Sequence, residues 1–228
     1  MSWRPVHSPN AVTVVLGPAC GDPRQAARRM LVRMAAELGP PLPEGAVPHV
    51  VRDDRGRPYL SLASGPHQPG SAGGDPWCRV SISHCAGVVA VALAAAEVGV
   101  DVELSRPLPV VNLARRWFDP AEAAWLASRP EQDRTEDFLR LWTAKEALGK
   151  ALGVGLRGSG TRRRVPLEPA LRRAWTPFPG RAFALALPEC PPGVVVAVAA
   201  AQPAGAPPVR LYGSGLAGCR PWRRPDGS

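Results

Sequence analysis

Residues 98–104 read Val98-Gly-Val-Asp-Val-Glu-Leu104, and this stretch predicts a β-strand that carries two carboxylates. Valine alternates with glycine, aspartate and glutamate, which is the period-two pattern of a strand. One face is apolar and suited to burial, and Asp101 and Glu103 project side by side from the other. Like charges at this spacing repel each other unless a cation lies between them or both face water. The stretch alone leaves two interpretations open, a metal-binding pair and a solvated strand face.

A helix further along the chain supplies a third carboxylate. The stretch Trp142-Thr-Ala-Lys-Glu-Ala-Leu-Gly-Lys150 lies within the helix predicted for residues 135–152, which has an apolar stripe and ends at Gly153. Glu146 and Lys150 are spaced for an ion pair on one face, which by itself is worth only about 0.2–0.5 kcal/mol. Trp142 shares this face, and the combination favours a site over a simple surface pair. Joined to the strand pair, Glu146 would complete an all-oxygen site for Mg²⁺.

The two lysines of the chain stand together on this helix. Of the 28 basic residues only Lys145 and Lys150 are lysine, and all the others are arginine. A chain with this arginine bias suggests that lysine is kept where a compact ammonium serves better than a planar guanidinium. Chance clustering on one helix is the alternative. We expect Lys145 to lie on a different part of the helix surface from Lys150 and to tolerate replacement by arginine better.

The remaining patterns predict an α+β fold. Asp119-Pro-Ala-Glu122 combines an N-cap, a proline at N1 and a glutamate at N3, so a helix should run from there to about residue 127. Another helix is predicted for residues 24–38, and strands for residues 12–16, 80–84, 88–95, 181–187 and 194–200. Each half holds a helix and strands, consistent with two similar lobes, residues 1–95 and 96–201. Residues 64–75 read as a polar loop, and the tail, residues 202–228, is expected to be disordered.

Composition and charge restrict the class of protein. No stretch approaches the roughly 20 apolar residues that a membrane span needs, and the first residues lack the pattern of a secretory signal, so we expect a soluble cytoplasmic protein with no membrane partner. The five cysteines are odd in number and lack zinc spacing, so neither disulfides nor zinc are expected. The net charge of +9 implies an anionic partner, which could be a nucleic acid, a membrane surface, a phosphorylated small molecule or an acidic protein. Arg162-Arg-Arg164 favours nucleic acid, but only 6% of residues are aromatic and no binding motif is present, so we expect no nucleic-acid partner.

Four motifs in order resemble the signature of 4′-phosphopantetheinyl transferases, and most of all the long type that activates surfactin synthetase. They are Ser81-Ile-Ser-His-Cys85, Val98-Gly-Val-Asp-Val-Glu103, Trp117-Phe-Asp-Pro-Ala-Glu122, and Trp142 to Lys150 followed by Gly153-Val-Gly155. The resemblance runs from about residue 24 to residue 200. It implies two α/β lobes related by a pseudo-two-fold axis, with coenzyme A bound in the cleft between them. By the same resemblance, the active site would lie in this cleft.

The resemblance also implies an activity. The enzyme would be a holo-[acyl-carrier-protein] synthase that uses Mg²⁺, or Mn²⁺, to move the 4′-phosphopantetheine arm of coenzyme A onto a serine of an apo acyl or peptidyl carrier protein. It would act as a monomer. Carrier proteins present an acidic helix next to this serine, which suits a basic enzyme. The alternative is a non-catalytic module of the same fold that binds carrier protein or coenzyme A, but that would not explain why the acids and Lys150 are intact.

Carried over residue by residue, the resemblance assigns roles to seven side chains. The metal ligands are Asp101, Glu103 and Glu146. Glu146 also serves as the base, and Lys150 stabilises the charge on the leaving phosphate. The contacts to coenzyme A are Arg24, Arg57, His84 and Lys150.

Two of these assignments have open alternatives. His84 shares a predicted strand face with Val80 and Ile82, so without the resemblance it would be interpreted as a core histidine. The family carries a longer segment before the residue that matches Arg24, including cations that hold the 3′-phosphate of coenzyme A. Arg28 or Arg29 could take their place here, although a helix with this much arginine could equally face water.

Overall fold

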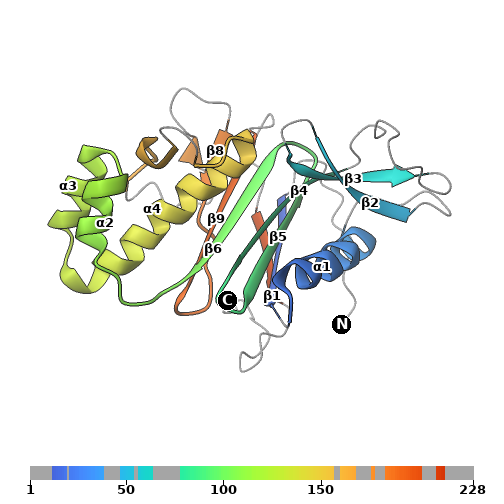
Figure 1. The fold of residues 1–228 in the computed structure, drawn as a ribbon, viewed down its shortest axis with the longest axis horizontal. Coiled ribbons are helices and arrows are strands. Elements are labelled where there is room, and N and C mark those ends of the chain that lie inside the picture. The colour runs from blue at the N-terminus through green and yellow to red at the C-terminus, as the bar shows by residue number, and fades with distance from the viewer. Residues whose placement is uncertain are drawn as a thin grey trace, which may run out of the picture.

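Two stacked β-sheets form the centre of the protein, with helices on both outer faces (Figure 1). The computed structural model describes residues 12–19, 21–38, 47–53, 56–63, 78–156, 160–167, 176–177, 183–201 and 209–213. Within these residues, no helix combines the length and the apolar character that a membrane crossing requires.

The first sheet has six strands in the order β10-β1-β5-β4-β3-β2. β10 runs parallel to β1, and the other neighbours are antiparallel. Helix α1 (Pro23–Leu38) lies on one face, where Leu31 and Met34 share a buried core with Val89 and Val91. The strands are β1 (Val12–Pro18), β2 (Val47–Arg52), β3 (Pro58–Ala63), β4 (Cys78–Cys85), β5 (Val88–Ala94) and β10 (Val209–Gly213).

The second sheet is antiparallel, in the order β6-β9-β8-β7. Its strands are β6 (Val98–Leu104), β7 (Thr176–Pro177), β8 (Phe183–Ala186) and β9 (Val194–Ala201). Helix α4 (Glu131–Leu152) covers its outer face, and helices α2 (Val110–Trp117) and α3 (Pro120–Ser128) pack against α4. A 3₁₀ turn, η1 (Gly160–Arg162), follows α4. In Figure 1, α4 runs diagonally across β6, β9 and β8.

Strand β6 is covered on both faces. Val98, Val100 and Val102 belong to the core between the two sheets. On the other face α4 rests directly on the strand, because a Cβ added to Gly99 would lie 1.9 Å from the Ala147 carbonyl oxygen. Asp101 shares this face and is only 5% exposed. The interpretation of a solvated strand face is therefore wrong for Asp101.

The predicted α+β class is confirmed, and local signals located several element ends. Asp119 and Glu122 form the predicted capping box of α3, and Gly153 ends α4 with a left-handed φ of 71°. The sequence did not predict α2, β2, β3, β7 or β10. β10 lies in the tail expected to be disordered, so that prediction is wrong for residues 209–213, where Val209 and Leu211 pack against the core between the sheets. The rest of the tail and the predicted loop 64–75 lie outside the described residues.

Candidate active site

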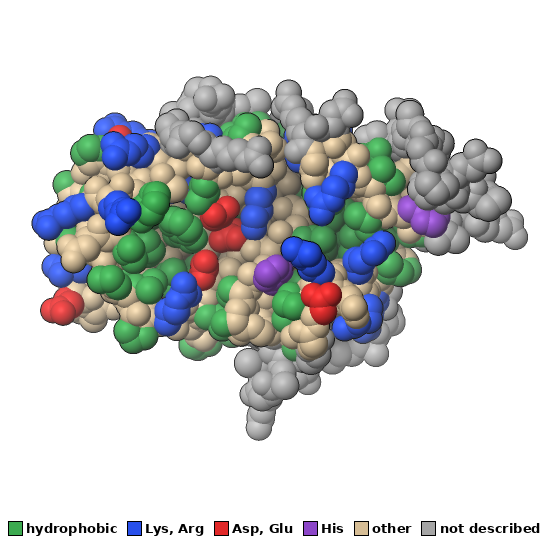
Figure 2. All heavy atoms as spheres, viewed as in Figure 1, with side chains coloured by type: hydrophobic (Ala, Val, Ile, Leu, Met, Phe, Trp, Pro, Cys, Tyr) green, Lys and Arg blue, Asp and Glu red, His purple; other side chains and the backbone are tan. Residues whose placement is uncertain are grey.

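The three predicted metal ligands influence one another electrostatically. Asp101 and Glu103 lie on β6 and Glu146 on α4. Burial raises the pKa of Glu146, and the Asp101 and Glu103 charges raise it further, while Lys150 lowers it. Figure 2 shows acidic side chains gathered in the middle of one face of the molecule, with basic side chains and a histidine beside them. In the described part of the chain, however, no three His, Cys, Asp or Glu side chains stand together as a formed metal site.

Asp101 is held by only one of its two carboxylate oxygens. Its Oδ1 accepts hydrogen bonds from Ser83 Oγ at 2.6 Å and from Lys150 Nζ at 2.8 Å. Its Oδ2 is buried and has no hydrogen-bond partner. Burial raises the pKa of Asp101, although Lys150 and Ser83 oppose this. A buried carboxylate oxygen without a hydrogen-bond partner costs free energy unless it binds a ligand or an ion.

Cations stand beside two of the carboxylates, and one pairing differs from the prediction. Lys150 contacts Asp101 and the Val100 carbonyl oxygen rather than Glu146, so the expected ion pair along the helix is replaced by one across to β6. Arg106 Nη1 donates to Glu103 Oε2 at 3.0 Å. The acids of β6 are thus partly neutralised by cationic side chains of the same chain.

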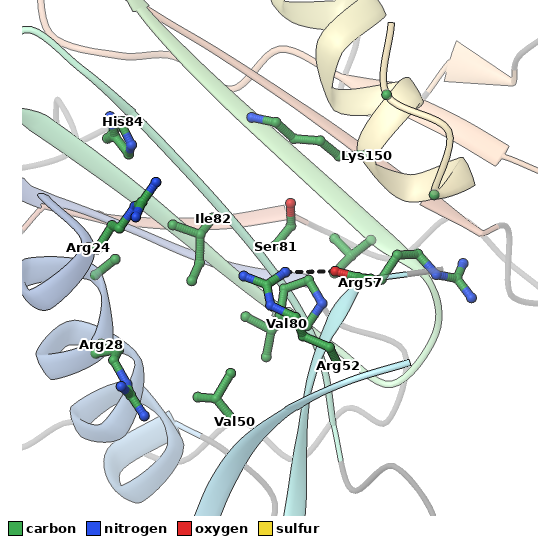
Figure 3. A pocket seen from close by; sticks show the side chains of 16 residues that line it. Arg24, Arg28, Val50, Arg52, Arg57, Val80, Ser81, Ile82, His84 and Lys150 are labelled. Carbon is green, nitrogen blue, oxygen red and sulfur yellow. Dashed lines mark hydrogen bonds between the residues drawn. The ribbon is translucent and has the colours of Figure 1, made fainter. Parts of the chain in front are cut away.

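A basic pocket of about 640 Å³ is lined by Lys150, the lysine that contacts Asp101 (Figure 3). The structure brings all four predicted coenzyme A contacts to its lining, which comes from α1, β2, β3, β4, β6 and the end of α4. They are Arg24, Arg57, His84 and Lys150. Arg28 and Arg52 also line the pocket. Of the two helix arginines left open by the sequence, Arg28 is the one at the pocket.

His84 is exposed, which rules out the alternative of a core histidine. It lies near the end of β4, and Arg24 of α1 points toward it in Figure 3. The pattern with Val80 and Ile82 was misleading because the apolar core under α1 includes these two side chains and does not extend to the end of the strand.

Arg57 has structural contacts as well as a place in the pocket wall. Its Nε donates to Asp53 Oδ2 at 2.7 Å and its backbone N–H to Asp53 Oδ1 at 2.9 Å. Its Nη1 donates to the Ala151 carbonyl oxygen at 3.4 Å, and Gly153 leaves room for its side chain. In Figure 3 the guanidinium points away from the middle of the pocket. Arg57 thus ties the β2–β3 turn to the end of α4.

Comparison with known proteins identifies the segment that contains the carboxylates and Lys150. Residues 97–178 match the profile of the 4′-phosphopantetheinyl transferase superfamily. This part of the chain is similar to that superfamily. The resemblance predicted from the sequence is therefore confirmed.

Individual 4′-phosphopantetheinyl transferases align with the same chain over limited lengths. The chain is 37% identical over 107 residues to a Synechocystis protein provisionally named as a 4′-phosphopantetheinyl transferase. The alignment covers 46% of this chain and 43% of that protein. The chain is 28% identical over 127 residues to a Bacillus subtilis 4′-phosphopantetheinyl transferase, covering 56% and 50%. To the transferase Sfp of Bacillus subtilis strain 168 it is 31% identical over 81 residues, 36% of each chain. The chain thus spans half or less of the length of these relatives.

Residues 97–178 also contain a buried charge pair. Lys145 is 0% exposed, and its Nζ lies 2.6 Å from Glu122 Oε2 and 4.9 Å from the centre of the Phe118 ring. Glu122 Oε2 also accepts from the Asp119 backbone N–H, and Oε1 accepts from that of Val165. The prediction that Lys145 lies on the helix surface is wrong. Glu122 does more than cap α3, because it joins that helix to α4 and to the segment after η1.

Trp142 packs against the hydrophobic core formed by the helices of this segment. Its ring stacks near Phe118 and Phe138, with centroid distances of 6.4 and 6.2 Å. Trp142 is thus half-buried against the helical core, and like Glu146 and Lys150 it lies on a partly exposed side of α4. The sequence missed Arg52, which lines the pocket, and Ser83, whose contact with Asp101 on a different strand alone reveals its connection to the site.

Proposed function

We propose that the protein transfers the 4′-phosphopantetheine group of coenzyme A to a serine of an apo carrier protein. The observation that carries this proposal is the basic pocket beside a buried carboxylate with one open oxygen, within a segment of the matching superfamily. The alternative, a non-catalytic binding module, does not explain why Asp101 Oδ2 is buried without a hydrogen-bond partner. The relatives are named for this activity, and the similarity of the chain to them supports it here.

The pocket suits a nucleotide with several phosphate groups. Its volume lies within the roughly 300–1,000 Å³ common for small-molecule sites, and its lining is rich in arginine. Arg24, His84 and Lys150 would contact the diphosphate of coenzyme A. Arg28 and Arg52, on the side formed by α1 and β2, would hold the 3′-phosphate that the sequence left unassigned. Arg57 would lie beside the nucleotide.

The carboxylates suit a hard divalent cation. Asp101, Glu103 and Glu146 offer only oxygen donors, and Asp101 Oδ2 is buried with its hydrogen-bonding capacity unused. These three residues would hold Mg²⁺ or Mn²⁺. When bound, the ion would neutralise charge on the phosphate oxygens and orient the phosphorus for in-line attack.

Side chains of the protein would accept the serine proton and stabilise the leaving group. The carrier serine oxygen forms a bond to the β-phosphorus of coenzyme A, the bond from this phosphorus to the bridging oxygen breaks, and 3′,5′-ADP leaves. Glu146 would accept the serine proton, and its raised pKa makes it a better base than an ordinary surface glutamate. Lys150 would stabilise the charge on the leaving phosphate with a compact ammonium.

We further infer two similar lobes, residues 1–95 and 96–201, related by a pseudo-two-fold axis. Each contains a sheet with its own helix cover, and residues of both ranges line the pocket. The pocket would then be the cleft between the lobes. β10 is an addition to this scheme, because it comes from beyond residue 201 and pairs with β1.

Incubation with coenzyme A, Mg²⁺ and a panel of apo acyl and peptidyl carrier proteins tests the proposal. Intact-mass measurement should show a carrier that gains one phosphopantetheine group. Binding of coenzyme A with no transfer to any carrier would favour the non-catalytic module instead.

A second comparison tests the pocket assignment. Arg28→Ala and Arg52→Ala should raise the KM for coenzyme A and leave the KM for 3′-dephospho-coenzyme A nearly unchanged. Arg29→Ala, on the same helix, is the control and should change neither. An equal loss with both substrates would contradict the assignment of Arg28 and Arg52 to the 3′-phosphate.

A further inference from the structure

Two buried serines of β4 connect the first sheet to β6 in different ways. Ser81 is 4% exposed and Ser83 is 7% exposed. Ser81 Oγ accepts a hydrogen bond from the Val100 backbone N–H at 2.9 Å. Ser83 Oγ donates to Asp101 Oδ1 at 2.6 Å. One serine therefore satisfies backbone, while the other holds a carboxylate.

The contact from Ser83 determines which oxygen of Asp101 stays open. Oδ1 receives donors from two elements, Ser83 on β4 and Lys150 on α4, and Oδ2 receives none. With the ammonium alone, the carboxylate could rotate and still keep a charged contact, because either oxygen can accept from an ammonium. Two donors from different directions fix its rotation, and short hydrogen bonds to an ionised oxygen are among the stronger ones in proteins.

The structure connects Ser83 to the site through Asp101. The lining of the basic pocket includes Ser81, Ile82 and His84 and omits Ser83. Its hydroxyl is buried between two sheets and already committed to Asp101. The contact that the structure shows between Ser83 and the site is therefore the one to the carboxylate.

We propose that Ser83 is a positioning residue that holds Asp101 Oδ1 so that Oδ2 faces a divalent cation. The inference rests on the proposed function, since it assigns Asp101 to the metal. Residues that orient metal ligands typically affect metal affinity by about 10–100-fold when removed. A merely structural serine would affect the stability of the fold and leave the metal affinity of the folded protein unchanged.

Calorimetric titration of Mn²⁺ into the full chain, without coenzyme A, tests this role. Ser83→Ala should weaken Mn²⁺ binding by about tenfold or more. Ser81→Ala is the matched control. It leaves the Val100 N–H without its acceptor and should lower the melting temperature, but the Mn²⁺ affinity should remain that of the wild type. Equal Mn²⁺ affinity in Ser83→Ala and wild type, or an equal loss in Ser81→Ala, would overturn the proposal.

A second pair of variants keeps the test decisive if Ser83→Ala folds poorly. Threonine and valine have nearly the same shape, but only threonine keeps the hydroxyl. Ser83→Thr should therefore bind Mn²⁺ better than Ser83→Val by about tenfold, and equal affinities would count against the proposal. If the wild type itself takes up no Mn²⁺, the metal-dependent function fails and this inference fails with it. If the wild type binds Mn²⁺ and the hydroxyl makes no difference, only the role of Ser83 is refuted.

Discussion

Helix α4 contributes a lysine to each of two ion pairs, and the two pairs differ in how completely their carboxylates are satisfied. Lys145 lies 2.6 Å from Glu122, and Lys150 lies 2.8 Å from Asp101. Both oxygens of Glu122 accept hydrogen bonds, and Lys145 is fully buried. Asp101 keeps a buried oxygen with no partner, and the Lys150 side chain is 28% exposed.

This difference indicates that the Glu122–Lys145 pair stabilises the fold, whereas the Asp101–Lys150 pair leaves an oxygen that can bind a ligand. A buried polar group that is completely satisfied makes the structure specific and rigid. A buried oxygen without a partner costs free energy in the isolated protein, and the cost is removed when a ligand binds there. Breaking the first pair should therefore reduce stability, and breaking the second should reduce activity.

The largest expected effect follows from breaking the Glu122–Lys145 pair. Lys145→Met leaves the Glu122 carboxylate buried without its counter-charge, and we expect the free energy of unfolding to fall by about 3–5 kcal/mol. Urea denaturation followed by circular dichroism measures this. The double variant Glu122→Gln/Lys145→Met buries no unpaired charge and should lose clearly less. Wild-type stability in Lys145→Met would show that the pair is not structural.

Next in size is the effect of Asp101→Asn on catalysis. The amide keeps the size of the side chain but cannot provide an anionic metal ligand, so we expect turnover to fall at least about 100-fold. The free energy of unfolding should stay the same or rise, because a charge whose pKa is raised by burial has been removed. The transfer rate and a denaturation curve on the same preparation check both parts. Near-normal turnover would remove Asp101 from the site.

Lys150→Arg should have a smaller effect on the rate. The guanidinium keeps the charge but is wider and planar, so it should misplace the donor relative to the leaving phosphate and lower kcat by about tenfold. Arg115→Lys, an exposed exchange on α2, is the control and should leave the rate unchanged. If Lys150→Arg turns over at the wild-type rate, Lys150 is only a countercharge for Asp101.

The two lysines also show what the sequence could and could not predict. Local signals located the start of α3 and the end of α4, because a capping box and a C-cap glycine act within a few residues. The pairing of Lys145 with Glu122 depends on how α3 packs on α4, so nothing in the local spacing marks Lys145 as buried. The contact from Ser83 to Asp101 joins two strands in different sheets and has no local signal either. α2 was missed because its N-cap position holds Pro109, which makes no side-chain capping hydrogen bond.

The smallest expected effect is a pH dependence of stability in the metal-free protein. Burial, with the Asp101 and Glu103 charges, raises the pKa of Glu146 in the folded state above its unfolded value. The folded state then binds the proton more tightly, so stability falls as the pH rises from about 4.3 through the raised pKa. At pH values below both the folded and the unfolded pKa of Glu146, this loss of stability is absent. Urea denaturation in EDTA should show wild type losing stability relative to Glu146→Gln across this window, and a difference that stays flat would contradict the shift.

The requirement for a divalent cation tests the central claim most directly. The account assigns the chemistry to carboxylates on β6 and α4 that hold a metal beside the basic pocket. Transfer to an apo carrier, measured by intact mass, should proceed with added Mg²⁺ or Mn²⁺, stop in excess EDTA and resume when the cation is restored. Transfer at the full rate in excess EDTA would contradict the metal site and the role given to Asp101.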